Sequence, residues 1–331
     1  MKQRISYIDS AKALLIIFVV LGHILQYANP RYDILPYTLM QEFIYAFHMP
    51  AFFLLSGMLS DAEVWRKRSF ADHIKSRCRT LVIPYIFFEL LAIVYKHFAL
   101  HSVSLKDGLY FMATLRCNVG ADWYLPALFL ASLLYWLYVR CPGRYTWIPV
   151  LTVSFIVPCI LPDGHGWNLL FRGLLGFGFM VTGGLLKNRF ARLSLCKCLA
   201  AFLLTAAAAA AALKFSLGND FYACELRCPP LFLLGGVCGL YFVLGLARLM
   251  DRRWLAWIGQ NTLVIMGTHQ LVLYTIPGNS SPLWVAGVFV LIAAVETAVV
   301  YLTNRFCPEL IGKKRKEPLP FCFAESRLSG K

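Results

Sequence analysis

Ten apolar stretches are the feature that most constrains what this chain of 331 residues can fold into. They lie at about 13–28, 43–60, 81–100, 123–139, 146–162, 167–186, 199–217, 229–249, 257–276 and 283–304. Their lengths are near or above the roughly 18 residues that mark a membrane-spanning helix. Because 59% of the residues are hydrophobic and only 15% are charged, the sequence excludes a water-soluble domain and predicts an all-α integral membrane protein with about ten transmembrane helices.

The basic residues are distributed unevenly between the predicted loops. If the N-terminus is cytoplasmic, the cytoplasmic segments contain 24 of the 32 lysine and arginine residues. The positive-inside rule therefore predicts that both termini are cytoplasmic, in agreement with an even number of spans. We expect one transmembrane domain over 1–331, ending in a short basic cytoplasmic tail at 305–331. The net charge of +15 follows from this asymmetry, so nucleic acid is not an expected partner.

Ionisable side chains inside the predicted spans point to function, because each costs roughly 2.5–3.5 kcal/mol on insertion scales. The residues are His23, His48, Glu89, His269 and Glu296, with Lys12 at the cytoplasmic end of the first span. Lys12 and His23 are eleven residues apart, which on a helix is about three turns and a rise of about 16 Å. The two side chains therefore share one face of the first helix.

Each of these polar groups also has a plain structural interpretation. Lys12 can extend to the membrane surface, and His23 can be a neutral histidine bonded within the bundle. Pro50 interrupts the helix beside His48, so His48 bonds the freed backbone or faces a cavity. The carboxylates of Glu89 and Glu296 either pair with buried cations or orient a histidine.

The segment 61–80 is the most densely basic loop of the chain. Arg77 and Arg79 stand directly before the third span, where a phosphorylated ligand from the cytoplasm would arrive. Arginine binds phosphate in a bidentate manner, which favours such a role. The alternative is ordinary positive-inside charge.

The stretch DSAKALLIIFVVLGH at 9–23 resembles the first helix of the acyltransferase family 3 membrane proteins. In that family a basic residue, usually arginine, precedes a histidine by ten intervening residues. Four further stretches resemble the family's later segments in the expected order: FIYAFHMPAFFLLSGML at 43–59, RCRTLVIPY at 77–85, ADWYLPALF at 121–129 and IGQNTLVIMGTHQ at 258–270. The first of these four is most similar to the fucose 4-O-acetylase-like branch. Lys12 departs from the pattern, because it keeps the charge but lacks the bidentate fork of arginine.

The resemblance implies a ten-helix enzyme in a bacterial cytoplasmic membrane. Such an acyltransferase moves a group other than an aminoacyl group, usually acetyl, from cytoplasmic acyl-coenzyme A to a hydroxyl of a cell-envelope saccharide or related acceptor. The expected partners are acyl-coenzyme A as donor substrate, a saccharide or lipid-linked saccharide, and membrane lipid. We expect no tightly bound cofactor and no metal, since no two histidines stand at i, i+4 on one helix.

The residues and the resemblance together assign roles. His23 would be the general base, because an imidazole with a pKa of about 6.5 can take a proton at neutral pH. The phosphates of coenzyme A would bind Lys12, Arg77 and Arg79. Further candidates are His48, Asn261 and His269 for stabilising the oxyanion or contacting the acceptor, and Trp123 and Tyr124 for stacking on a sugar ring.

Two other functions also fit parts of the pattern. A proton-coupled transporter, or a flippase for an envelope precursor, would also use buried histidine and glutamate side chains. Against transport, no inverted repeat is visible in the sequence, and the basic segment before the third span favours an anionic cytoplasmic ligand. A non-catalytic scaffold or sensor is the remaining alternative.

Overall fold

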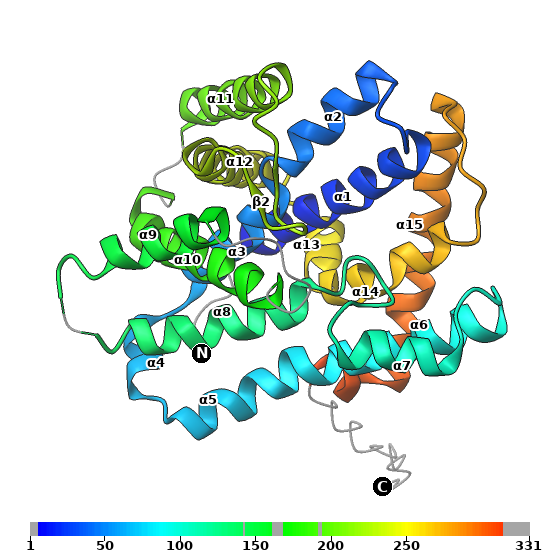
Figure 1. The fold of residues 1–331 in the computed structure, drawn as a ribbon, viewed down its shortest axis with the longest axis horizontal. Coiled ribbons are helices and arrows are strands. Elements are labelled where there is room, and N and C mark those ends of the chain that lie inside the picture. Colours follow the sequence, from blue (N-terminus) through cyan, green and yellow to red (C-terminus); the bar gives the residue numbers. More distant parts are fainter. Residues whose placement is uncertain (1–5, 142, 161–167, 191–193, 314–331) are drawn as a thin grey trace, which may run out of the picture.

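A computed structural model describes residues 6–141, 143–160, 168–190 and 194–313. Helices make up almost all of this part of the chain (Figure 1). They are α1 Ser6–Ala28, α2 Leu35–Tyr45, α3 His48–Leu59, α4 Ala62–Lys67, α5 Phe70–Arg77, α6 Ile83–Phe98, α7 Leu105–Ala113, α8 Tyr124–Tyr138, α9 Trp147–Ile160, α10 Asn168–Phe190, α11 Leu195–Lys214, α12 Pro229–Leu249, α13 Arg253–Gly259, α14 Thr262–Leu273 and α15 Pro282–Phe306. A π-helical turn, Cys78–Val82, joins α5 to α6, and a 3-10 turn, Pro308–Ile311, follows α15. The strands β1 Asn219–Asp220 and β2 Glu225–Leu226 form a short antiparallel hairpin between α11 and α12.

Each predicted apolar stretch contains helix where the structure describes it, although 43–60 and 257–276 are each interrupted by a break. Seven helical segments in the described ranges are long and apolar enough to cross a membrane, and α8, α9 and α14 are apolar but shorter. The expected all-α, multi-pass membrane architecture is therefore confirmed, whereas the number of ten spans and the side of the termini stay predictions. Parts of the predicted spans 146–162 and 167–186, and most of the predicted tail, lie outside the described residues.

The second predicted span, 43–60, is interrupted. Helix α2 ends at Tyr45 and α3 begins at His48, with Pro50 in the first turn of α3. Proline is tolerated there because the first turn of a helix has no intrahelical acceptor for its N–H groups. The break leaves the carbonyl of Ile44 without its helical partner, and Nδ1 of His48 lies 2.8 Å from that oxygen. The hydrogen bond to freed backbone that Pro50 suggested for His48 is thus confirmed.

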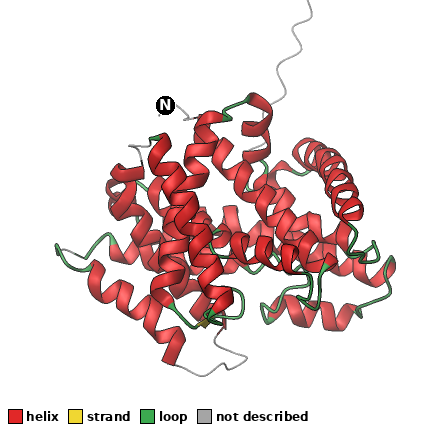
Figure 2. Ribbon diagram, turned by 90° about the horizontal axis from the view of Figure 1, so that it is seen from above, coloured by secondary structure: helices red, strands yellow, loops and turns green. Residues whose placement is uncertain are grey.

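Helix α1 runs through the middle of the bundle (Figure 1). It packs against α2, α3, α12, α13, α14 and α15, which come from both halves of the sequence. Ala11, Leu15 and Ile24 are consequently fully buried. In a view turned by 90°, the molecule is again a bundle of helices joined by loops (Figure 2). A polar side chain on α1 is therefore enclosed by protein rather than by lipid.

Helices α3 and α10 approach each other unusually closely. A Cβ atom on Gly183 would lie 2.0 Å from the carbonyl oxygen of Leu54, and one on Gly57 would lie 1.9 Å from that of Met180. Both glycines are therefore needed for backbone contact across this pair, as small residues commonly are between membrane helices.

Candidate active site

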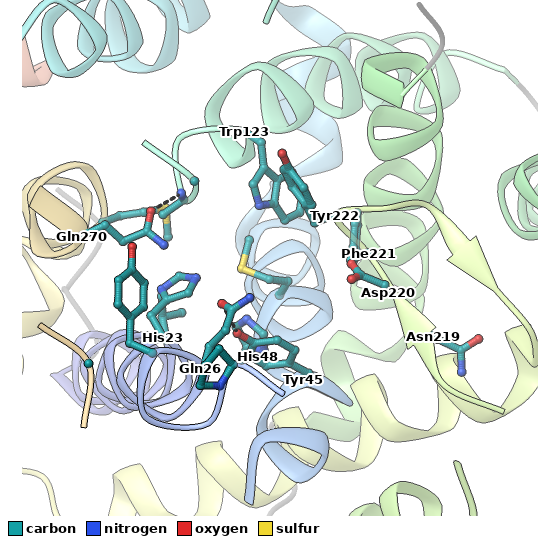
Figure 3. A pocket seen from close by; sticks show the side chains of 18 residues that line it. His23, Gln26, Tyr45, His48, Trp123, Asn219, Asp220, Phe221, Tyr222 and Gln270 are labelled. Atoms are coloured by element: carbon teal, nitrogen blue, oxygen red, sulfur yellow. Dashed lines mark hydrogen bonds between the residues drawn. The ribbon is translucent and has the colours of Figure 1, made fainter. Parts of the chain in front are cut away.

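A cavity of about 660 Å³ lies beside the last two turns of α1. Its wall is built from α1, the α2–α3 junction, the segment 120–123, the β-hairpin and α14 (Figure 3). The volume falls within the range of about 300–1,000 Å³ that is typical of small-molecule sites. Of the residues predicted from sequence to be functional, His23, His48 and Trp123 line this cavity.

His23 is held by a second histidine. Its Nδ1 lies 2.9 Å from Nε2 of His269, and Nδ1 of His269 lies 2.6 Å from the carbonyl oxygen of Ile265. A carbonyl can only accept, so in neutral His269 the proton is on Nδ1 and Nε2 carries the lone pair. That lone pair accepts the Nδ1–H of His23. The free lone pair of His23 is therefore on Nε2.

His48 reaches the same cavity from the break between α2 and α3. Its Nδ1–H donates to the Ile44 carbonyl, which leaves Nε2 as a lone-pair acceptor. Neutral His48 can therefore accept a hydrogen bond from a ligand hydroxyl. It cannot donate one to an oxyanion unless it is protonated, so this tautomer favours contact with the acceptor over oxyanion stabilisation.

An aromatic wall stands on the far side of the cavity from His23 (Figure 3). The ring centres of Trp123 and Phe221 are 5.2 Å apart, and that of Tyr222 lies 6.2 Å from Trp123. Buried Arg172 braces this wall, since its Nε donates to the Tyr222 carbonyl at 2.7 Å and its guanidinium lies 4.2 Å from the centre of the Tyr222 ring. Such a wall offers aromatic faces on which a sugar ring can stack.

Tyr124 is adjacent to Trp123 in sequence but does not line the cavity. Its ring packs against Phe53, with the ring centres 5.0 Å apart, in the core between α3 and α8. Successive residues at the start of a helix point in different directions, which separates the two aromatic side chains. The predicted stacking of Tyr124 on a sugar stays a prediction.

The buried carboxylate of Glu89 holds the segment that carries Trp123. It accepts hydrogen bonds from the backbone N–H of Asn118 at 2.8 and 2.9 Å, from the Asn118 side chain at 2.7 Å and from the N–H of Val119 at 3.3 Å. On α14, the side chain of Gln270 accepts the N–H of Ala121 at 3.0 Å. Glu89 thus positions backbone, and its pairing with a cation or a histidine stays a prediction.

Glu296 is the second carboxylate for which the sequence left the role open. Both of its oxygens lie 2.8–2.9 Å from the hydroxyl oxygen of Thr268, which also lies 2.8 Å from the Val264 carbonyl oxygen. Thr268 precedes His269 on α14, so Glu296 acts on the helix that carries His269 and not on a histidine ring directly.

Two of the three predicted donor-binding residues, Lys12 and Arg79, lie toward the opposite end of α1. Lys12 Nζ lies 3.3 Å from Asp9 Oδ1, and the side chain of Gln260 donates to Asp9 Oδ2 at 3.4 Å. The next residue, Asn261, accepts from Lys313 Nζ at 2.7 Å. Arg79 reaches the same place, where its Nη2 donates to the Lys313 carbonyl at 3.4 Å. Lys12, Arg79, Lys313 and Asn261 form what we call the basic end of the molecule.

The structure places two of the predicted site residues, Asn261 and Arg77, away from the positions expected from the sequence. Asn261 lies at the basic end rather than among the residues that line the cavity, so its predicted contact with the acceptor has no support in the geometry. Arg77 lies apart from Arg79, with its guanidinium 4.8 Å from the centre of the Trp65 ring. Residues 77 and 79 point in different directions because the chain is helical there.

Sequence reasoning missed several cavity residues. Gln26 could have been predicted from the sequence, because it stands three residues after His23 on the same face of α1. Tyr45 and Gln270 lie within the quoted stretches 43–59 and 258–270 but carry no distinguishing pattern. Asp220 and Tyr222 come from a hairpin distant in sequence, for which no signal was available.

Comparison with known proteins places the chain in a family. The family described as "Acyltransferase domain" matches residues 5–303. Two relatives are both called nodulation protein NolL. The one from Mesorhizobium japonicum is 34% identical over 131 residues, and the one from Sinorhizobium fredii is 35% identical over 159 residues.

The two matches cover 38% and 46% of this chain, and the chain spans only 34% and 41% of the respective relatives. No solved structure matches the chain significantly. The family match, in contrast, includes α1 through most of α15, and so contains His23, His269 and the whole cavity wall. The chain therefore belongs to this family of acyltransferases.

Proposed function

We propose that this protein is a membrane O-acyltransferase that moves an acyl group, normally acetyl, from cytoplasmic acyl-coenzyme A to a hydroxyl of an envelope saccharide. One observation carries the proposal. Hydrogen bonds link the Ile265 carbonyl to His269 and His269 to His23, and they leave Nε2 of His23 with a free lone pair. His23 lines a cavity whose wall is polar and aromatic.

The chemistry follows from the tautomers. Nε2 of His23 takes the proton of the acceptor hydroxyl as its oxygen attacks the thioester carbonyl, and a C–O bond forms while the C–S bond breaks. The departing thiolate of coenzyme A then takes the proton from the imidazolium. His269 stabilises that imidazolium, because its Nε2 lone pair continues to accept the Nδ1–H of His23.

The two ends of α1 suit the two substrates. The basic end carries Lys12, Arg79 and Lys313, which provide positive charge for the phosphates of coenzyme A. Lys12 and His23 lie on one continuous helix, with a rise of about 16 Å between them along the axis. An extended pantetheine arm has a comparable length. With a cytoplasmic N-terminus, the acceptor cavity lies toward the other side of the membrane.

The test is release of free thiol from acetyl-coenzyme A by purified protein in detergent, with methyl hexosides and oligosaccharides as acceptors. We expect His23→Asn to lower turnover by about 10²–10⁴-fold, the usual cost of losing a general base. A matched control is His101→Asn, because His101 is exposed in a loop with a φ of 49° that asparagine accepts.

Normal turnover by a folded His23→Asn variant would contradict the assignment of the base. A transport assay distinguishes acyl transfer from the alternative function of transport. Movement of a labelled saccharide into vesicles by the wild-type protein, with no release of coenzyme A, would replace acyl transfer by transport.

A further inference from the structure

We infer that the acceptor is a neutral oligosaccharide whose next sugar unit binds in a second chamber beside the catalytic cavity. The inference rests on the proposed function and specifies its substrate. The chamber has a volume of about 390 Å³ and shares Gln26, Tyr45, Asn219 and Asp220 with the wall of the catalytic cavity. The two spaces are therefore neighbours that share part of their walls.

The junction between the two spaces lies close to the proposed base. The Tyr45 hydroxyl donates to Oε1 of Gln26 at 3.3 Å, which joins α2 to α1 at this point. Gln26 follows His23 by about one helical turn. A saccharide whose reacting hydroxyl lies at His23 would therefore extend its neighbouring unit past Tyr45 and into the chamber.

The lining of the chamber has the chemistry of a carbohydrate site. Residues that line only the chamber include Gln41, Glu42, Ser216, Glu225 and Arg227. Amides, carboxylates and a guanidinium supply both acceptors and donors, which matches sugar hydroxyls, since each hydroxyl both donates and accepts. The aromatic wall belongs to the catalytic cavity, so the two spaces divide stacking from hydrogen bonding.

The charges favour a neutral ligand over an anionic one. Glu42 on α2 lines the chamber, and Asp220 on the hairpin lines both spaces and so lies at their junction. Oδ1 of Asp220 already accepts the N–H of Ala223 at 2.9 Å, which leaves its other oxygen for a ligand. The guanidinium of Arg227 donates to the Ser216 carbonyl at 3.1 Å. A uronate or phosphorylated sugar would face Asp220 at the junction and Glu42 inside the chamber.

Gly218 offers a way to fill the chamber without disturbing its neighbours. It lines the chamber, and a Cβ atom added there meets no other atom within 4 Å. Gly287 on α15 is the matched control, because it has equally open surroundings and lines neither space. The variants to compare are Gly218→Trp and Gly287→Trp, with Glu42→Gln as a second chamber variant that keeps the volume.

The measurement is kcat/KM for acetyl-coenzyme A turnover with a panel of methyl hexosides and their matching linear tetrasaccharides. We expect wild type and Gly287→Trp to prefer a tetrasaccharide by about 10-fold or more, as one or two additional hydrogen bonds would provide. Gly218→Trp should abolish this preference, and Glu42→Gln should reduce it. Neither variant should change kcat/KM for the methyl hexoside by more than about twofold, because its hydrogen bonds lie outside the chamber.

Calorimetric binding of the same saccharides separates failure of this inference from failure of the proposed function. If wild type releases no coenzyme A but binds a tetrasaccharide that Gly218→Trp does not bind, acyl transfer is wrong and the subsite stands. A wild-type protein without preference for the longer saccharide, or equal losses for both probes in Gly218→Trp, would overturn the inference. Absence of saccharide binding by wild type would overturn it as well.

Discussion

The imidazole of His23 is oriented by hydrogen bonding as well as by packing. Sequence reasoning placed His23 at the centre of the chemistry and gave His269 a direct contact with the acceptor. The structure places His269 behind His23, fully buried and absent from the cavity wall. Two histidines 246 residues apart in sequence cannot be paired by spacing, so this partnership only emerged from the packing of α14 against α1.

The first prediction concerns His269 as a positioning residue. His269→Ala removes the acceptor for the Nδ1–H of His23, and we expect kcat to fall by about 10–100-fold with KM little changed, as for other partners that orient a histidine. His269→Gln retains a carbonyl acceptor and should recover part of the rate. The pH profile of kcat should shift in His269→Ala and return toward wild type in His269→Gln. Equal kinetics for the two variants would contradict the role.

The second prediction concerns Asp122 and the dependence of protein stability on pH. In the described structure neither of its carboxylate oxygens has a hydrogen-bond partner, and burial, together with the nearby Glu89, raises the pKa of Asp122 well above its usual value. Above about pH 4 the unfolded chain releases this proton whereas the folded chain keeps it, so stability falls as the pH rises toward the raised pKa. Asp122→Asn should therefore unfold at a higher temperature than wild type at pH 7.

Measuring both proteins at several pH values provides the control for this prediction. The difference in unfolding temperature between Asp122→Asn and wild type should shrink as the pH approaches 4, because both forms are then uncharged. A constant difference across this range would show that the effect arises from packing rather than from the proton.

Among the elements, breaks in helices lie beside the functional groups. The break between α2 and α3 directs His48 into the cavity, and the break between α13 and α14 places Asn261 at the basic end. In the sequence, Pro50 indicates the first of these two breaks. The second has no proline, and 257–276 reads as one apolar stretch, so only the packed structure reveals it. The 117–123 segment likewise depends on Glu89 from a different helix.

The third prediction tests the contact between α3 and α10. Gly183→Ala would place a methyl group 2.0 Å from the Leu54 carbonyl oxygen, so the helices must separate. We expect a loss of about 1–3 kcal/mol in stability, the usual cost of overpacking, seen as a lower unfolding temperature in detergent. Gly287→Ala, with open space around it, should not lower the unfolding temperature. If both variants unfold alike, the close approach of α3 and α10 is wrong.

On the scale of the whole molecule, the two sites lie at opposite ends of α1. The positive charge of Lys12, Arg79 and Lys313 is gathered at one end and the cavity at the other. This separation agrees with a donor that arrives from one side of the membrane and an acceptor that binds nearer the other. The helices of the family match enclose α1, so its side chains between the two ends lie within protein.

The fourth prediction concerns orientation in the membrane. With both termini cytoplasmic, a cysteine at position 67 should face the cytoplasm and one at position 279 should face the opposite side. We would introduce Lys67→Cys or Asn279→Cys after replacing by serine the exposed Cys141, Cys159 and Cys196 and, in the predicted tail, Cys322. A membrane-impermeant maleimide should label position 279 in right-side-out vesicles and position 67 in inverted ones. The reverse labelling pattern would show that both termini lie on the other side of the membrane. Labelling of both positions from the same side would contradict the predicted number of spans.

The amino-acid sequence determined the features that depend on local composition and spacing. Apolar stretches of spanning length define the membrane fold, charge asymmetry predicts its orientation, and the eleven-residue spacing of Lys12 and His23 places them on one helical face. The pairing of His23 with His269, the role of Glu89 and the chamber beside the cavity were decided only by tertiary structure. Each joins segments far apart in the chain, and hydrogen bonds between such segments depend on how helices pack, which no local pattern encodes.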